Sequence, residues 1–201
     1  MLERDSVTDE RLQRIETALE KLAARQSEVL ARLDRLEGGS LEGGAKGPPA
    51  ASVRERTIAF LDQFRAGEAL GESSLGAWIA VCRDTDLRGA LRVVQTREGS
   101  HARLLAERIK ELGGAPRYEI PEDTWEQVMA GSSSIETSDA EKVEAFVSRF
   151  PDPERAFAPI FAIAEQLDGD PETRSLLCAI AGDERATLEL FYAARERMSG
   201  K

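Results

Sequence analysis

The chain contains a single histidine, His101, and a glutamate, Glu98, lies three residues before it. Residues i and i+3 of a helix share one face, so these two side chains would point in the same direction. A carboxylate and an imidazole on one face form a ligand pair for divalent transition metals. The alternative is a buried Glu–His ion pair without metal, or a histidine that is hydrogen-bonded to a neighbouring helix. With one histidine, any mechanism that needs two histidines from the same chain is excluded.

Ionisable residues also interrupt the apolar stripes of three long segments that have helical periodicity. Burying a lone carboxylate is very costly unless it is paired, protonated or metal-bound, so several of them in one interior need a compensating cation. The interrupting residues, with their segments, are Glu68 (54–82), Glu98 and His101 (86–112), and Glu184 (171–198).

The turn between the first two segments predicts that Glu68 and His101 lie at the same level. The turn is centred near residue 84, with roughly 16 residues to each side chain and a helical rise of about 1.5 Å per residue. If the register differs by one helical turn, Glu72 replaces Glu68. The sequence therefore predicts a single layer of carboxylates around His101.

Residues 52–201 read as an all-α domain. Gly113-Gly114 is a helix stop, and Asp152-Pro153 has the form of a helix start, with that third helix running to about residue 168. The connection of about forty residues between 112 and 152 contains at least one short helix, over 139–149. Two helical hairpins joined by one long crossover predict a four-helix bundle.

The sequences of the two predicted hairpins align without a gap at an offset of 86 residues. Asp84 then meets Asp170, and Glu98 meets Glu184. Glu68 meets Glu154 in the same register. The shared register indicates an internal duplication.

A glutamate on one helix followed by Glu-x-x-His on the next, given twice, resembles the ferritin-like superfamily, in particular rubrerythrin-type bundles. The first half, Glu68 and Glu98-Gly-Ser-His101, is complete. The second half, Glu154 and Glu184-Arg-Ala-Thr187, has threonine where the resemblance implies histidine. The resemblance covers 54–112 and 152–198, and it implies iron or manganese as the metal. The ligands that it implies are Glu68, Glu98, His101, Glu184 and Glu154.

Two functions of different classes follow. The first is an iron-binding or iron-handling protein of ferritin-like type, which as an enzyme would be a di-iron oxidoreductase. The threonine at position 187 argues against that enzyme, because oxygen activation at two irons normally relies on two equivalent half-sites. The alternative is a non-catalytic structural or interaction module that has lost its di-metal site and holds no metal. A site completed by His101 of a second chain is a third arrangement.

The N-terminal segment predicts self-association. Leu12, Leu19, Gln26 and Leu33 occupy the a positions of a heptad over residues 8–37, and apolar residues occupy the d positions. Residues 1–37 therefore form a predicted coiled-coil helix, and the Gly-rich residues 38–51 a flexible linker. We expect a homo-oligomer, with a protein partner as a further option. The alternative is an amphipathic helix that packs on its own domain.

The charge and hydropathy of the chain restrict the classes of partner that it can bind. The net charge of −10 and the pI of about 4.8 argue against nucleic acid and against anionic lipid. The longest apolar run is far shorter than the roughly 20 residues of a membrane span, and the N-terminus lacks an apolar secretory core. We therefore expect no membrane insertion and a cytoplasmic protein. Cys82 and Cys178 lie in apolar helical patterns and are expected to be small core residues.

Overall fold

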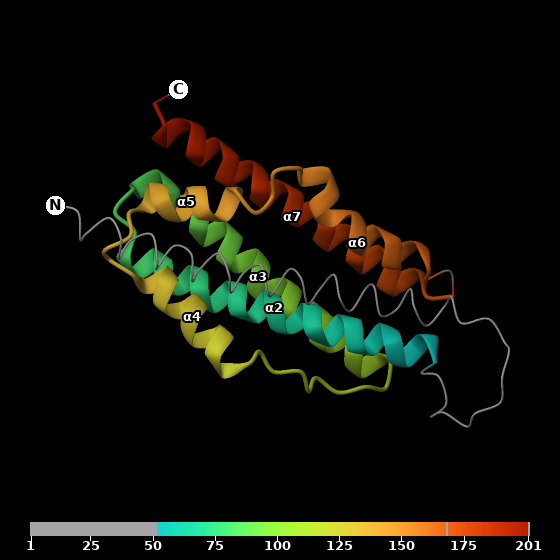
Figure 1. The fold of residues 1–201 in the computed structure, drawn as a ribbon. Helices are drawn as coiled ribbons and strands as arrows, with labels where there is room; N and C mark the ends of the chain where they lie inside the picture. Colours follow the sequence, from blue (N-terminus) through green and yellow to red (C-terminus); the bar gives the residue numbers. More distant parts are fainter. Residues whose placement is uncertain (1–51, 168, 201) are drawn as a thin grey trace, which may run out of the picture.

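The computed structural model describes residues 52–167 and 169–200, which are all-helical and contain no strand (Figure 1). The predicted coiled coil and linker, 1–37 and 38–51, lie outside the described residues. No helix in the described ranges is both long and apolar enough to cross a membrane. The helices are α2 (Val53–Val81), α3 (Thr85–Glu111), α4 (Glu122–Ser133), α5 (Asp139–Val147), α6 (Pro153–Glu165) and α7 (Pro171–Met198).

Side-chain caps define where the long helices begin. Ser52 accepts a hydrogen bond from the backbone of Glu55, whose carboxylate accepts one from the backbone of Ser52 in return. The α3 helix is capped by Asp84 and α7 by Asp170, and each carboxylate accepts from a backbone N–H three residues on. These two caps are 86 residues apart, in agreement with the register of the predicted duplication.

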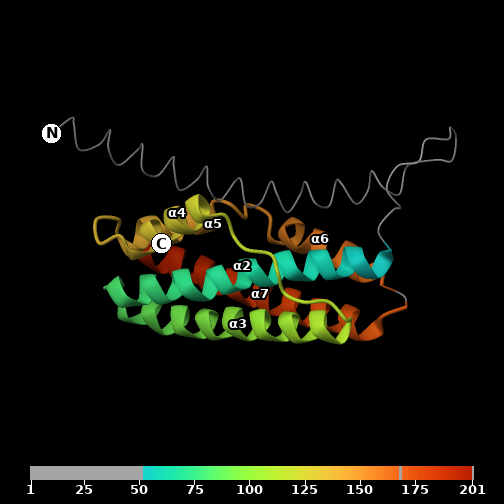
Figure 2. The same ribbon diagram turned by 90° about the horizontal axis from the view of Figure 1, so that it is seen from below.

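A glycine stop ends α3 as predicted. Gly113 has φ 73°, a left-handed conformation that suits glycine, and the N–H of Gly114 donates to the carbonyl of Ile109 at 2.9 Å. The chain then runs back along α2 (Figure 2). Asp62 of α2 fixes this segment, because its carboxylate accepts from the backbone N–H groups of Arg117 and Tyr118, both at 2.7 Å.

A common interior is formed by side chains of α2, α3, α5, α6 and α7. The α2–α3 hairpin packs on α7, and α5 and α6 both pack along α7, while α4 packs on the outside of α2 (Figures 1 and 2). The two predicted helices, over 139–149 and from Pro153 to about residue 168, are confirmed as α5 and α6, although α6 ends at Glu165, about three residues before the predicted end. Pro151 explains the break between them, since proline has no N–H to donate and disfavours helical backbone in the residue before it. The α4 helix was not predicted.

Two apolar clusters fill the bundle, one on each side of a polar layer. The first contains Leu75, Trp78, Cys82, Leu87, Leu91, Val94, Val143, Val147, Phe191 and Ala194. The second contains Leu61, Phe64, Leu105, Ile109, Ile163, Ala164, Leu167, Leu177 and Ile180. Along α2, α3 and α7 the residues between these sets include Glu68, His101 and Thr187, which are all buried. The interior is therefore interrupted at the level that the sequence predicts.

The two cysteines differ in their surroundings. Cys82 is buried in the first apolar cluster, as expected. Cys178 is exposed, so the prediction of a core position was wrong for that residue. Its neighbour Leu177 occupies the inward stripe of α7, and one residue further along a helix turns the side chain by about 100°.

Candidate metal centre

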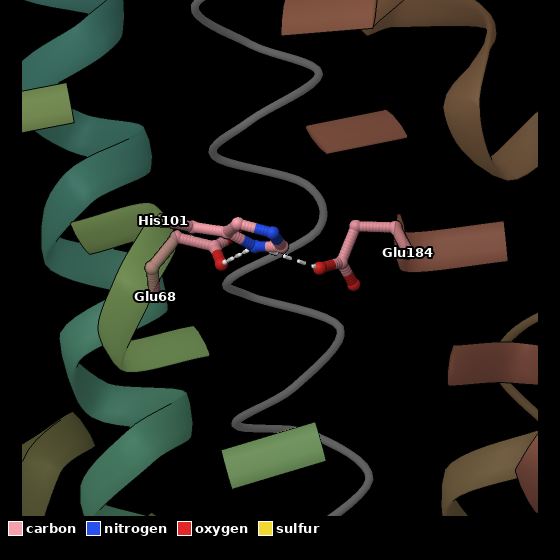
Figure 3. Close-up of side chains that lie close together, drawn as sticks. All are labelled: Glu68, His101 and Glu184. Carbon is pink, nitrogen blue, oxygen red and sulfur yellow. Dashed lines mark hydrogen bonds and ion pairs between the residues drawn. The ribbon is translucent and has the colours of Figure 1, made fainter. Parts of the chain in front are cut away.

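Three helices bring one ionisable side chain each to the polar layer. Glu68 comes from α2, His101 from α3 and Glu184 from α7, and the imidazole ring lies between the two carboxylates (Figure 3). One ligand atom from each of the three lies within 4.8 Å of the other two. Glu68 and His101 are about 95% buried or more, and Glu184 is partly buried. This spacing suits the coordination of one divalent cation.

Both ring nitrogens of His101 face carboxylates. Nδ1 lies 2.9 Å from Oε2 of Glu68 and 3.3 Å from Oε1 of Glu184. Nε2 lies 3.1 Å from Oδ2 of Asp183, whose side chain is half-exposed at the edge of the layer. In the metal-free protein the ring is therefore held as an imidazolium cation between acids. Burial alone would lower the pKa of His101, but the adjacent carboxylates of Glu184, Glu68 and Asp183 outweigh this effect and raise the pKa to about 10.

Burial also disfavours the charged form of two carboxyl groups in the layer, those of Glu68 and Glu98. Burial raises the pKa of Glu68 to about 7, with the negative charge of Glu184 adding to the effect and the hydrogen bond with His101 opposing it. Burial, together with the charges of Glu68 and Glu184, also raises the pKa of Glu98 well above its ordinary value. Crowding of acids in this layer thus favours either bound protons or a bound cation.

Glu98 reaches the layer through a space left by glycine. A Cβ at Gly71 would lie 2.3 Å from Oε2 of Glu98, so the absence of a side chain there admits the carboxyl group between α2 and α3. Glu98 lies next to Glu68, but it is not one of the three residues whose ligand atoms converge. The substitute residue, Glu72, lies instead against Gly99, where a Cβ would be 2.2 Å from its Oε1.

One polar atom of the cluster lacks a partner of its own. Oε1 of Glu184 is buried and has no hydrogen-bond donor among the described residues, although it forms the longer ion pair with His101. Nδ1 carries at most one hydrogen, and Glu68 at 2.9 Å is its nearer acceptor. Oε1 of Glu184 is therefore left without a hydrogen-bond donor in the described part of the chain, and a bound metal ion would supply a partner for it.

The second half-site differs from the first. Thr187 is buried, and its hydroxyl accepts a hydrogen bond from Nη1 of Arg97 at 3.4 Å. The guanidinium of Arg97 thus lies next to Thr187, the residue that occupies the position where the resemblance implies a second histidine. Glu154 lies in the first turn of α6, and its side chain is outside the part of the structure that is described. Its role as a ligand stays a prediction.

Asp183 was missed by the sequence reasoning. Its position directly before Glu184 is off the apolar stripe of α7, so periodicity assigns it to the surface. Only the packing of α7 against α3 shows that the edge of the layer is within reach of its carboxylate. The one available signal was an acidic residue adjacent to a predicted ligand.

Comparison of the chain with protein-family models, with curated proteins and with solved structures found no match. The resemblance to the ferritin-like superfamily therefore rests on the chain's own residues. The all-α prediction is confirmed for the described residues, and the ferritin-like assignment stays a prediction.

Proposed function

We propose that the chain is a ferritin-like four-helix-bundle protein that binds one divalent transition-metal ion, iron or manganese, in the polar layer. Glu68, His101 and Glu184 are its ligands, and Glu98 lies next to them. The observation that carries the proposal is the convergence of these three ligand atoms from α2, α3 and α7 within 4.8 Å. Carboxylates with one imidazole are the donor set that ferrous and manganous ions accept in proteins.

Asp183 supports this assignment through the tautomer of His101. When Nε2–H donates to the Asp183 carboxylate, Nδ1 is free to present its lone pair towards Glu68 and Glu184. A carboxylate that accepts from the second ring nitrogen is the usual partner of a metal-binding histidine, since it fixes the ring orientation and raises the basicity of the ligand.

Arg97 favours one metal ion over two. Its guanidinium contacts Thr187 at the level of the incomplete half-site, so a fixed positive charge already lies there. A second metal ion nearby would meet charge repulsion and would lack an imidazole ligand. A single iron or manganese ion in this layer would supply one-electron redox chemistry, and we propose iron binding or iron handling as the role, rather than two-iron oxygen activation.

The alternative is a structural module whose layer is complete without metal. The observation in its favour is that imidazolium at position 101 is held by Glu68 and Asp183 at hydrogen-bond distances. Such an ion-pair layer keeps the helices in register without any bound ion.

Metal content separates the two functions. Full-length protein is loaded anaerobically with Fe²⁺ or Mn²⁺, desalted and measured by elemental analysis. We expect about one ion per chain and a higher melting temperature in the presence of metal, because a ligand of the folded state stabilises it by mass action. Glu184→Gln keeps the volume of the side chain and removes its charge, and it should lower metal affinity by at least tenfold.

Glu189→Gln is the matched control, since Glu189 is exposed on the same helix. It should bind metal as the wild type does. Wild-type protein that holds no metal under these conditions, or a Glu184→Gln variant that binds as tightly as the control, would establish the structural module instead.

A further inference from the structure

A cavity of about 160 Å³, partly open to solvent, lies beside the polar layer and is lined by residues of α2, α3, α4, α5 and α7. The two helices of the crossover, α4 and α5, supply about half of its lining. An engineered protein cavity of about 150 Å³ holds a benzene molecule, so the space fits a compact ligand of that size or slightly larger.

Most of the wall is apolar and much of it is aromatic. The apolar lining residues include Leu75, Trp78, Val94, Phe146 and Phe191. The Trp78 and Phe191 rings stack with their centroids 6.0 Å apart, and the Phe146 centroid is 4.1 Å from that of Phe191. Contacting aromatic rings make the wall rigid and favour a flat apolar ligand.

Lys142 places a buried cation in this wall. Its side chain is 9% exposed, and Nζ donates to the carbonyls of Ser132 and Ser134 at 2.9 and 2.7 Å. An ammonium group has three hydrogens; two of them donate to these carbonyls, and Nζ also lies 5.7 Å from the centroid of the Trp78 ring. Burial lowers the pKa of Lys142, and the negative charge of Asp139 only partly opposes this. A third acceptor with negative charge would therefore stabilise the ammonium form.

Glu98 is the one carboxylate among the described residues that line the cavity. Among the described residues no carboxylate pairs with Lys142, whose hydrogen bonds go to two backbone carbonyls.

We infer that this cavity binds a small monocarboxylic acid with an apolar or aromatic body, of about the size of benzoate. The carboxylate pairs with Lys142, and the body lies against the aromatic wall. This site is separate from the proposed metal centre, although Glu98 belongs to the surroundings of both. The inference does not depend on metal binding.

Titration calorimetry of the full chain with benzoate tests the inference, both after metal loading and after treatment with chelator. Benzoate should bind saturably in both preparations. Benzamide, which has the same shape without the charge, should bind at least tenfold more weakly, because a charge-assisted hydrogen bond to Lys142 is lost. This comparison needs no variant.

Two variants locate the site. Lys142→Met keeps the length of the side chain and should weaken benzoate binding by at least tenfold, while Lys110→Met, at an exposed lysine of α3, should not. Ala145→Phe fills the cavity without altering Lys142 and should abolish binding of benzoate and benzamide alike. Circular dichroism establishes that each variant is folded before it is titrated.

Equal affinity for benzoate and benzamide would overturn the role of the cation. Undetectable binding of benzoate to the wild type, or full binding by a folded Ala145→Phe variant, would overturn the site. Because the titrations are run with and without metal, failure here leaves the metal result unaffected, and a metal-free wild type leaves this result standing.

Discussion

At the scale of single residues, the polar layer depends on where side chains are missing as much as on where they are present. Glu98 lies between α2 and α3 because Gly71 leaves room for its carboxyl group. Only that carboxyl group, the far end of a flexible side chain, would have to move to admit a methyl group at position 71. The position is therefore a means of displacing Glu98 without unfolding the helix.

Gly71→Ala should reduce metal affinity by about tenfold and leave the fold intact. The new Cβ would lie 2.3 Å from Oε2 of Glu98 and must push it away from the layer. Alanine stabilises a helix interior by roughly 0.5–1 kcal/mol relative to glycine, so the melting temperature should not fall. Metal affinity is measured by competition with a chelator.

Gly67→Ala is the matched control, because it lies one turn earlier on α2 and a Cβ there meets nothing within 4 Å. It gives the same gain in helix propensity with no effect on Glu98. Equal metal affinity in the two variants would mean that Glu98 contributes nothing to the metal site.

At the scale of elements, Asp139 joins the crossover to the first hairpin. It is the first residue of α5, and its carboxylate accepts from the backbone N–H groups of Arg83 and Asp84 at 2.8 and 3.0 Å. The indole N–H of Trp78 donates to its other oxygen at 2.9 Å. Burial would raise the pKa of Asp139, but these donors outweigh it and lower the pKa below the ordinary 3.8. One side chain thus holds α5 on the α2–α3 turn.

Asp139→Asn should lower the free energy of unfolding at pH 7 by about 1–3 kcal/mol, since the amide has one acceptor oxygen where the carboxylate has two. The wild-type contribution is present above pH 4 or so and is lost as pH falls through the lowered folded-state pKa, because the unfolded chain binds the proton first. Urea unfolding across pH 3–7 should therefore show a smaller difference between wild type and variant at the acid end.

Asp86→Asn is the control for this series, since the Asp86 side chain is 80% exposed. It should follow the wild type throughout. A difference between wild type and Asp139→Asn that stays constant down to pH 3 would contradict the role of the ionised carboxylate.

At the scale of the whole molecule, the prediction of self-association rests on a segment outside the described residues. The heptad predicted over 8–37 would expose apolar a and d positions that need a partner surface. Apolar Ala23 and Leu30 at e positions favour an oligomer larger than a dimer. The bundle has its own apolar clusters on both sides of the polar layer, so we expect it to fold without this segment.

Deletion of residues 1–45 should lower the number of chains per particle and leave the helical content of the bundle unchanged, as measured by light scattering and circular dichroism. In the full chain, Leu22→Glu at a d position should have the same effect. Ala24→Glu, at an f position on the outside of the heptad, should not. An unchanged particle mass after the deletion would contradict the coiled coil.

The features that the sequence determined by itself depend on residues close together in the chain. The starts of α3 and α7 at Asp84 and Asp170, the stop at Gly113 and the inward stripes follow from capping and periodicity, which involve residues a few positions apart. The level of Glu68 and His101 follows as well, because a short turn between two helices of regular rise leaves little freedom. These features were predictable without any long-range information.

What only the tertiary structure decided is how distant segments meet. The approach of α7 puts Glu184 on Nδ1 and Asp183 on Nε2 of His101, contacts that span more than 80 residues of chain. The cavity beneath α4 and α5 likewise depends on packing across the crossover. Helical periodicity states which face of a segment turns inward, but the neighbour that covers that face is set by the packing of the whole bundle.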